Sequence, residues 1–209
     1  KIGWVFSEEL FQAGCSLKKN ADVYGKYYPD YEPALLEKYC GQFGLKTERK
    51  LGKLSKGEKL KFQFAFALSH RPELLLLDEP TANFDPEFRE EFLAVITDFI
   101  SDGEHSVVLA THLTRDLDRL ADYITMLNNG KLVFSLERSV LEDRYRIVSG
   151  EQYKLKLLPA ERVLAMEKGA YGTKAFVVHS RRMVYDPELS VSVPTLEEIM
   201  YYSMVASKR

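Results

Sequence analysis

The fold of this protein is decided by residues 74–80, which read Leu-Leu-Leu-Leu-Asp-Glu-Pro. The run of leucines has the length of a β-strand. A strand that is apolar at every position is typical of a parallel sheet covered on both faces. We therefore expect residues 74–77 to be a buried strand that ends in two adjacent carboxylates.

Asp78 and Glu79 would lie at the carboxyl end of that strand, where α/β sheets bind their ligands. A carboxylate at position 78 can hold a Mg²⁺ that bridges nucleotide phosphates. A carboxylate at position 79 can orient or deprotonate a water. The alternative interpretation is a pair of solvated acids that caps a turn before Pro80.

The neighbouring segments alternate between strand and helix patterns. Strands are expected at residues 2–6 and 106–110, the second again buried, and helices at 87–100 and 113–121. Asn129-Gly130 is a strong two-residue hairpin turn between short strands. This order predicts an α/β sheet. After about residue 137, short strand-like pieces mix with two short helices, near 160–167 and 195–204.

The segment before the leucines is helical. Residues 16–50 look helical and polar, with breaks at Pro29 and Pro33, and Pro33 suits the first turn of a helix that Gly44 would cap. Residues 55–58 read Ser-Lys-Gly-Glu, a capping box in front of an apolar run. We expect a helix over residues 56–69.

Two further patterns could bind phosphate. The hydroxyl of Ser55 and the free N–H groups of a helix N-terminus form an anion site, and Gly57 would let a phosphate approach the backbone. A capping box alone is usually structural. His112 ends the strand at 106–110 and could donate to a terminal phosphate, although a lone histidine is more often structural. The other histidines, at positions 70, 105 and 179, are interpreted as structural.

Composition excludes several classes. The 209 residues are 45% apolar and 29% charged, with a formal net charge of −2, so no basic surface for nucleic acid is indicated. Cys15 and Cys40 are too few for a disulfide framework and lack zinc-ligand spacing. No apolar run approaches the ~20 residues of a membrane span. Because Lys1 is followed directly by a strand pattern, we expect the sequence to begin inside a domain.

Four motifs in sequence order resemble those of the nucleotide-binding domain of ABC transporters. Leu54–Glu58 is similar to the signature motif, residues 74–80 to Walker B, Thr81-Ala82-Asn83-Phe84-Asp85 to the D-loop, and Thr111-His112 to the switch-histidine loop. The resemblance covers about residues 1–135. It implies a P-loop NTPase-like α/β core in residues 1–136 with an inserted helical subdomain at about 16–70. Residues 137–209 would then be a small α+β appendage.

The resemblance implies roles for the matching residues. Asp78 would help to hold Mg²⁺, Glu79 would be the catalytic base, and His112 would contact the γ-phosphate of ATP. The signature residues Ser55, Lys56, Gly57 and Glu58 would contact a nucleotide bound by a second ATPase subunit, in a homodimer or heterodimer, and Asp85 would lie at the subunit interface.

Several positions depart from the family pattern. Lys56 and Glu58 replace a glycine and a glutamine, Phe84 replaces a leucine, and Ser7 occupies the place of the Q-loop glutamine, with Glu8 or Glu9 as possible substitutes. No G-x-x-x-x-G-K-[ST] phosphate-binding loop occurs. Without that loop nothing cradles the β-phosphate, so we expect these 209 residues alone neither to bind nor to hydrolyse ATP appreciably. Because the sequence is also expected to begin inside a domain, we expect truncation rather than loss of the loop.

Residues 194–199, Pro-Thr-Leu-Glu-Glu-Ile, are similar to the closing segment of ATPases that serve ABC-2 exporters of drugs and antibiotics. An amphipathic helix with Thr195 as N-cap is an equal alternative. The resemblance implies an ATPase held by a membrane permease on the cytoplasmic face of the cell membrane, without nucleic acid. Two alternatives stay open: a soluble ABC-type ATPase acting on nucleic acid or ribosomes, and a regulatory cassette without a P-loop.

Overall fold

The computed structural model describes residues 1–6, 8, 10–169 and 172–206. Ser7 and Glu9, two of the residues considered for the Q-loop position, lie outside the described residues. The chain forms two compact units, Lys1–Leu113 and Thr114–Arg209. The boundary between these units lies after Leu113, whereas the ATPase domain was expected to end at residue 136. The expected domain limits stay a prediction.

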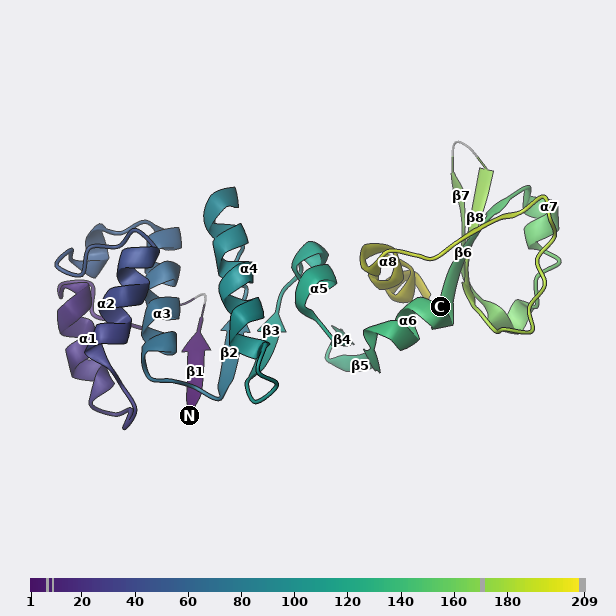
Figure 1. Cartoon of the computed structure of the whole chain (residues 1–209). Coiled ribbons are helices and arrows are strands. Elements are labelled where there is room, and N and C mark those ends of the chain that lie inside the picture. The colour runs from purple at the N-terminus through teal and green to yellow at the C-terminus, as the bar shows by residue number, and fades with distance from the viewer. Residues whose placement is uncertain (7, 9, 170–171, 207–209) are drawn as a thin grey trace. The chain divides into compact units, whose positions relative to one another are not determined.

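A parallel three-stranded sheet forms the centre of the first unit (Figure 1). Its strands are β1 (Ile2–Val5), β2 (Leu74–Asp78) and β3 (Ser106–Ala110), in the order β1-β2-β3. The pairing places Val5 opposite Leu77 and Leu77 opposite Leu109. Because the strands are parallel, their carboxyl ends lie at one edge, and the expected strands are confirmed.

The helices of the first unit follow the expected order. They are α1 (Leu17–Gly25), α2 (Pro33–Gln42), the 3₁₀ turn η1 (Leu51–Lys53), α3 (Lys56–Ser69) and α4 (Pro86–Ile100). Helix α2 begins at its proline, and Gly44 follows its end with φ +71°, as a C-terminal cap requires. Helix α3 has the bounds that the capping box predicted.

Aromatic side chains fill the interior between the helices and one face of the sheet. The side chains of Phe62, Phe64 and Phe92 are fully buried. The rings of Phe64, from α3, and Phe92, from α4, lie 4.7 Å apart between centroids. Since α3 contacts β1 and α4 contacts β3, this packing fixes the helices on the strands and so positions the loops at the strand ends.

The opposite face of the sheet is open, which the sequence did not predict. Trp4, Leu76 and Val108 share this face through their register, and Trp4 and Val108 are 42% and 58% exposed. Over the residues that the structure describes, no element of the first unit covers them. The expectation that residues 74–77 and 106–110 are buried on both faces is therefore wrong, because only the helical side of this sheet is covered.

The second unit begins with α5 (Thr114–Leu120), the hairpin of β4 (Tyr123–Asn128) and β5 (Lys131–Glu137), and α6 (Arg138–Arg144). Both residues of the hairpin turn have positive φ, 50° at Asn129 and 72° at Gly130. That is the conformation of a type I′ turn, and the predicted hairpin is confirmed. These two strands form a sheet of their own.

An antiparallel sheet in the order β7-β8-β6-β9 completes the second unit. Its elements are β6 (Tyr145–Gly150), α7 (Gln152–Leu155), η2 (Ala160–Arg162), β7 (Val163–Gly169), β8 (Gly172–Val178), β9 (Ser190–Ser192) and α8 (Leu196–Ala206). The helix expected near 160–167 is wrong: one 3₁₀ turn precedes β7, because residues 163–169 pair with β8. The helix expected near 195–204 is confirmed as α8.

Among the described residues, no helix combines the length and apolar character that a membrane crossing requires.

Candidate active site

Glu79 stands directly after β2 and turns the chain away from the sheet. Its main-chain N–H donates to the carbonyl of Ala110 at 2.9 Å, which extends the pairing with β3 by one residue. Its φ of +46° lies in the left-handed region. For a residue other than glycine this conformation costs on the order of 1 kcal/mol, so other contacts must hold the residue in place.

The side chain of Glu79 supplies those contacts. Its Oε1 accepts from the main-chain N–H of His112 at 3.0 Å and lies 2.8 Å from the Nδ1 of the same residue. Its Oε2 accepts from the Thr111 hydroxyl at 3.3 Å. The Glu79 side chain is 32% exposed and the His112 ring 70%. The carboxylate is thus fixed in position while the histidine faces solvent.

Asp78 is the last residue of β2 and is exposed, with Ala110 of β3 as its register partner. In the described residues no group of three or more His, Cys, Asp or Glu side chains could hold a metal ion by itself. A nucleotide-bound Mg²⁺ does not need such a cage, because it binds through one or two carboxylates and the substrate phosphates. The Asp78 carboxylate fits that role.

The signature segment begins α3 with a complete capping box. The Ser55 hydroxyl accepts from the N–H of Glu58 at 3.2 Å, and the Glu58 carboxylate accepts from the N–H of Ser55 at 2.8 Å. Glu58 also pairs with Arg49. The main-chain N–H of Ser55, followed by Arg49, holds the pKa of Glu58 below its ordinary value. The structure therefore gives Glu58 partners within its own chain, whereas Lys56 is exposed.

Asp85 ends the D-loop and caps α4. Its Oδ1 accepts from the N–H of Phe88 at 2.9 Å, and its Oδ2 lies 3.5 Å from the Nζ of Lys61. The N–H of Phe88 and then the charge of Lys61 hold the pKa of Asp85 below its ordinary value. A carboxylate is favoured at this place because it faces a helix N-terminus and a cation.

The structure groups the expected residues in two places. Glu79 and His112 are in direct contact, with Asp78 next to them in sequence. The signature segment lies against the D-loop, because a methyl group added at Gly57 would meet the Asn83 carbonyl at 2.7 Å. Ser55 makes no contact with the first group among the described hydrogen bonds, and the sequence-based roles of all these residues stay predictions.

Sequence reasoning missed Gln63, a buried residue of α3. Its Oε1 accepts from the N–H of Phe6 at 2.9 Å and its Nε2 donates to the carbonyl of Glu8 at 3.0 Å. The side chain thus fixes the segment that leaves β1, where the Q-loop is expected. The available signal was a polar amide inside the otherwise apolar run of residues 62–68.

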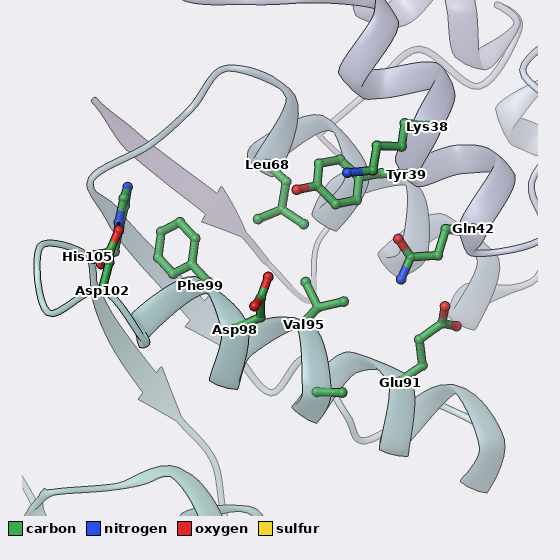
Figure 2. Close-up of a pocket in the computed structure, with 11 residues that line it drawn as sticks. Lys38, Tyr39, Gln42, Leu68, Glu91, Val95, Asp98, Phe99, Asp102 and His105 are labelled. Atoms are coloured by element: carbon green, nitrogen blue, oxygen red, sulfur yellow. Dashed lines mark hydrogen bonds and ion pairs between the residues drawn. The ribbon is translucent and has the colours of Figure 1, made fainter.

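A separate hollow of about 450 Å³ lies on the first unit between α2 and α4. Figure 2 shows Tyr39 and Gln42 of α2 facing Glu91, Val95 and Asp98 of α4. No motif residue lines it. We therefore locate the candidate chemistry at the strand ends and not in this hollow.

Comparisons with known proteins agree with the motifs. Residues 1–82 match the family model described as ABC transporter. The bacitracin transport ATP-binding protein BcrA of Bacillus licheniformis is 28% identical over 148 residues, which are 70% of this chain and 48% of that protein. The Nod factor export ATP-binding protein I of Rhizobium leguminosarum bv. viciae is 28% identical over 171 residues, 76% of this chain and 54% of that protein. The chain thus spans about half the length of these relatives.

A solved structure shows the same fold. It is the dimeric, post-hydrolysis state of the ATP-binding cassette MJ0796 bound to ADP and Pi, with a TM-score of 0.58 and 20% identity, covering 66% of this chain and 62% of that one. The expected ABC-type α/β fold is confirmed. Residues 1–82 are therefore similar in sequence to ABC transporter ATP-binding proteins, and the chain shares the fold of an ATP-binding cassette.

Proposed function

We propose that this chain belongs to a subunit that binds and hydrolyses ATP to energise a membrane ABC exporter. The observation that carries the proposal is the position of Glu79. It follows the buried Leu77 and the acidic Asp78 at a strand end, and Thr111 and His112 fix its carboxylate. A carboxylate held at the carboxyl end of a parallel strand suits a base that acts on a bound ligand.

In the proposed reaction, Glu79 orients the attacking water and accepts its proton. His112, which is largely exposed beside it, donates to the terminal phosphate. Asp78 would hold Mg²⁺, which supplies charge neutralisation on the β- and γ-phosphate oxygens when bound. The residues of this chain therefore contribute mainly positioning, which is the protein's principal task in phosphoryl transfer.

We further propose that Ser55 and Gly57 contact a nucleotide held by a second ATPase subunit. The N-terminus of α3 presents N–H groups that favour an anion. Two observations support a partner: Ser55 has no described contact with Glu79 or His112, and the related cassette MJ0796 was solved as a dimer. Lys56, exposed at the first position of α3, adds a positive charge on the same side.

The exporter assignment rests on the relatives and on the closing segment. The names of two relatives specify bacitracin transport and Nod factor export. The helical region of residues 16–70 would dock on a permease, which would hold the protein peripherally on the cytoplasmic face of the membrane. In the structure, Thr195 caps α8 through Glu198, so the sequence Pro-Thr-Leu-Glu-Glu also has a purely structural use. The net charge of −2 favours this proposal over a nucleic-acid partner.

The second candidate is a regulatory cassette that offers only its signature face to a partner. Such a cassette would leave ATP turnover insensitive to Glu79.

The test compares the full-length gene product with its Glu79→Gln variant. We expect the wild type to hydrolyse ATP, and the variant to bind ATP normally while its turnover falls by ~10²–10⁴-fold, the usual effect of losing a general base. Glu87→Gln, an exposed acid in the first turn of α4, serves as the control with normal turnover. Turnover that survives Glu79→Gln would exclude Glu79 as the base.

A further inference from the structure

The signature segment and the D-loop touch each other within this one chain. Gly57, in the first turn of α3, packs so closely that a Cβ there would lie 2.7 Å from the carbonyl oxygen of Asn83. No real Cβ tolerates such a distance to a backbone atom without a shift. The position therefore requires glycine for a contact inside the subunit, independently of any nucleotide.

Lys61 adds an electrostatic link one turn further along α3. Its Nζ lies 3.5 Å from the Oδ2 of Asp85 and 4.0 Å from the ring centroid of Phe88. Its side chain is only 16% exposed. A lysine in this environment combines an ion pair with a cation–π contact. The ion pair itself is open to solvent on the side of Asp85, whose side chain is 58% exposed, so the packing of the lysine against Phe88 is the better shielded of the two contacts.

Asp85 connects this lysine to the start of the next helix. One oxygen of its carboxylate accepts from Lys61, and the other caps α4 through the N–H of Phe88. The ring of Phe84, in the D-loop, also packs against α4: its centroid lies 4.5 Å from that of Phe88 and 5.4 Å from that of Phe92. The D-loop is thus held to both α3 and α4 by charge and by packing.

We propose that Lys61 is a positioning residue that holds the D-loop, Thr81–Asp85, to the signature helix so that the two segments move as one body. A phosphate that contacts Ser55 and Gly57 then displaces the loop that leaves Glu79 of the same subunit. This consequence rests on the proposed function, whereas the holding contact does not. Phosphate binding at the signature segment of one subunit in this way shifts the position of that subunit's own catalytic carboxylate.

The experiment replaces Lys61 in the full-length gene product by methionine, which keeps the length but not the charge, and by arginine. We expect Lys61→Met to lower kcat roughly tenfold, a factor that corresponds to about 1.4 kcal/mol in the barrier, with KM and the Kd for ATP within about twofold. Lys61→Arg should restore most of kcat. Lys174→Met, which removes an exposed ion pair with Glu198 outside the helical region, is the matched control and should leave kcat unchanged.

Hydrogen exchange tests the holding contact without reference to turnover. The amides of Phe84 and Phe88 donate to the Thr81 carbonyl and to Asp85, and Lys61→Met should speed their exchange at least severalfold. The amide of Lys59, which donates to the Ser55 carbonyl within α3, should not change. Adding Asp85→Asn to the Lys61→Met variant should raise these exchange rates little further, because both changes break the same ion pair.

The outcomes separate the two claims. A wild type without ATP turnover would defeat the proposed function, and the exchange rates would still decide the role of Lys61. If kcat and the exchange of Phe84 and Phe88 are both unchanged in a folded Lys61→Met variant, the positioning role is overturned. A lowered kcat that Lys61→Arg does not rescue would also contradict it, because the arginine keeps the charge.

Discussion

Glu79 and His112 are joined twice, once through the main-chain N–H of the histidine at 3.0 Å and once through its ring Nδ1 at 2.8 Å. The two contacts use the same carboxylate oxygen. They connect the end of β2 to the loop after β3, and the other oxygen, which accepts from the Thr111 hydroxyl, completes the network. The carboxylate is therefore oriented before any ligand arrives, which is how electrostatic preorganisation is built.

The first prediction concerns the ring of His112. In the full-length gene product, His112→Ala removes the ring contact and leaves the main-chain one. We expect ATP turnover to fall roughly ten- to a hundredfold, about 1.4–2.7 kcal/mol in the barrier, while ATP affinity changes little. Steady-state kinetics and a binding titration measure both. His105→Ala, at a histidine that pairs with Asp102, is the control, and equal losses in both variants would contradict the assignment.

The second prediction concerns pH. Burial lowers the pKa of His70 from 6.5 to about 4, and its ring stacks on Tyr28 at 4.1 Å. Between these values the unfolded chain binds a proton that the folded chain excludes. The free energy of unfolding is therefore intact above the unfolded pKa and declines as pH falls through this window.

Urea denaturation at pH 7 and pH 5 measures this effect. Between pH 7 and pH 5, the free energy of unfolding of the wild type should fall by roughly 2 kcal/mol more than that of His70→Phe. The phenylalanine keeps the aromatic packing and removes the titration. Parallel pH dependence in the two proteins would show that His70 is not kept neutral by the fold.

The third prediction concerns the hairpin of the second unit. Gly130 has φ +72° and nothing within 4 Å of an added Cβ, so Gly130→Ala would meet backbone strain without a steric clash. We expect a loss of about 1 kcal/mol in the free energy of unfolding. Gly14→Ala, also in open space but without positive φ, is the control. A variant at position 130 as stable as the control would argue against the type I′ turn.

Elements with local signals were predictable from the sequence. Helix α3 begins where its capping box does, because Ser55 and Glu58 satisfy the helix N-terminus without help from the rest of the chain. The hairpin turn at Asn129-Gly130 is equally local. The strand at residues 74–77 could be predicted because leucine runs of that length suit a sheet interior.

Features that depend on distant partners were not predictable. Residues 163–169 form β7 because β8 pairs with them, so tertiary pairing overrides a short helical pattern. The open face at Trp4 and Val108 depends on which elements pack against the sheet. The site followed the same division. The motifs predicted Glu79 and His112, but only the structure showed that the two side chains touch, that Gln63 contacts Phe6 and Glu8, and that Lys61 pairs with Asp85.

The central claim is that the signature of one subunit and the strand-end carboxylate of another act on one shared nucleotide. The most direct measurement mixes full-length subunits that carry Ser55→Arg with subunits that carry Glu79→Gln and follows ATP turnover. In a mixed dimer both lesions fall in one composite site and leave the other whole. The account predicts turnover in the mixture well above that of either variant alone. Turnover no higher than the average of the separate variants, with mixed dimers demonstrably present, would contradict it.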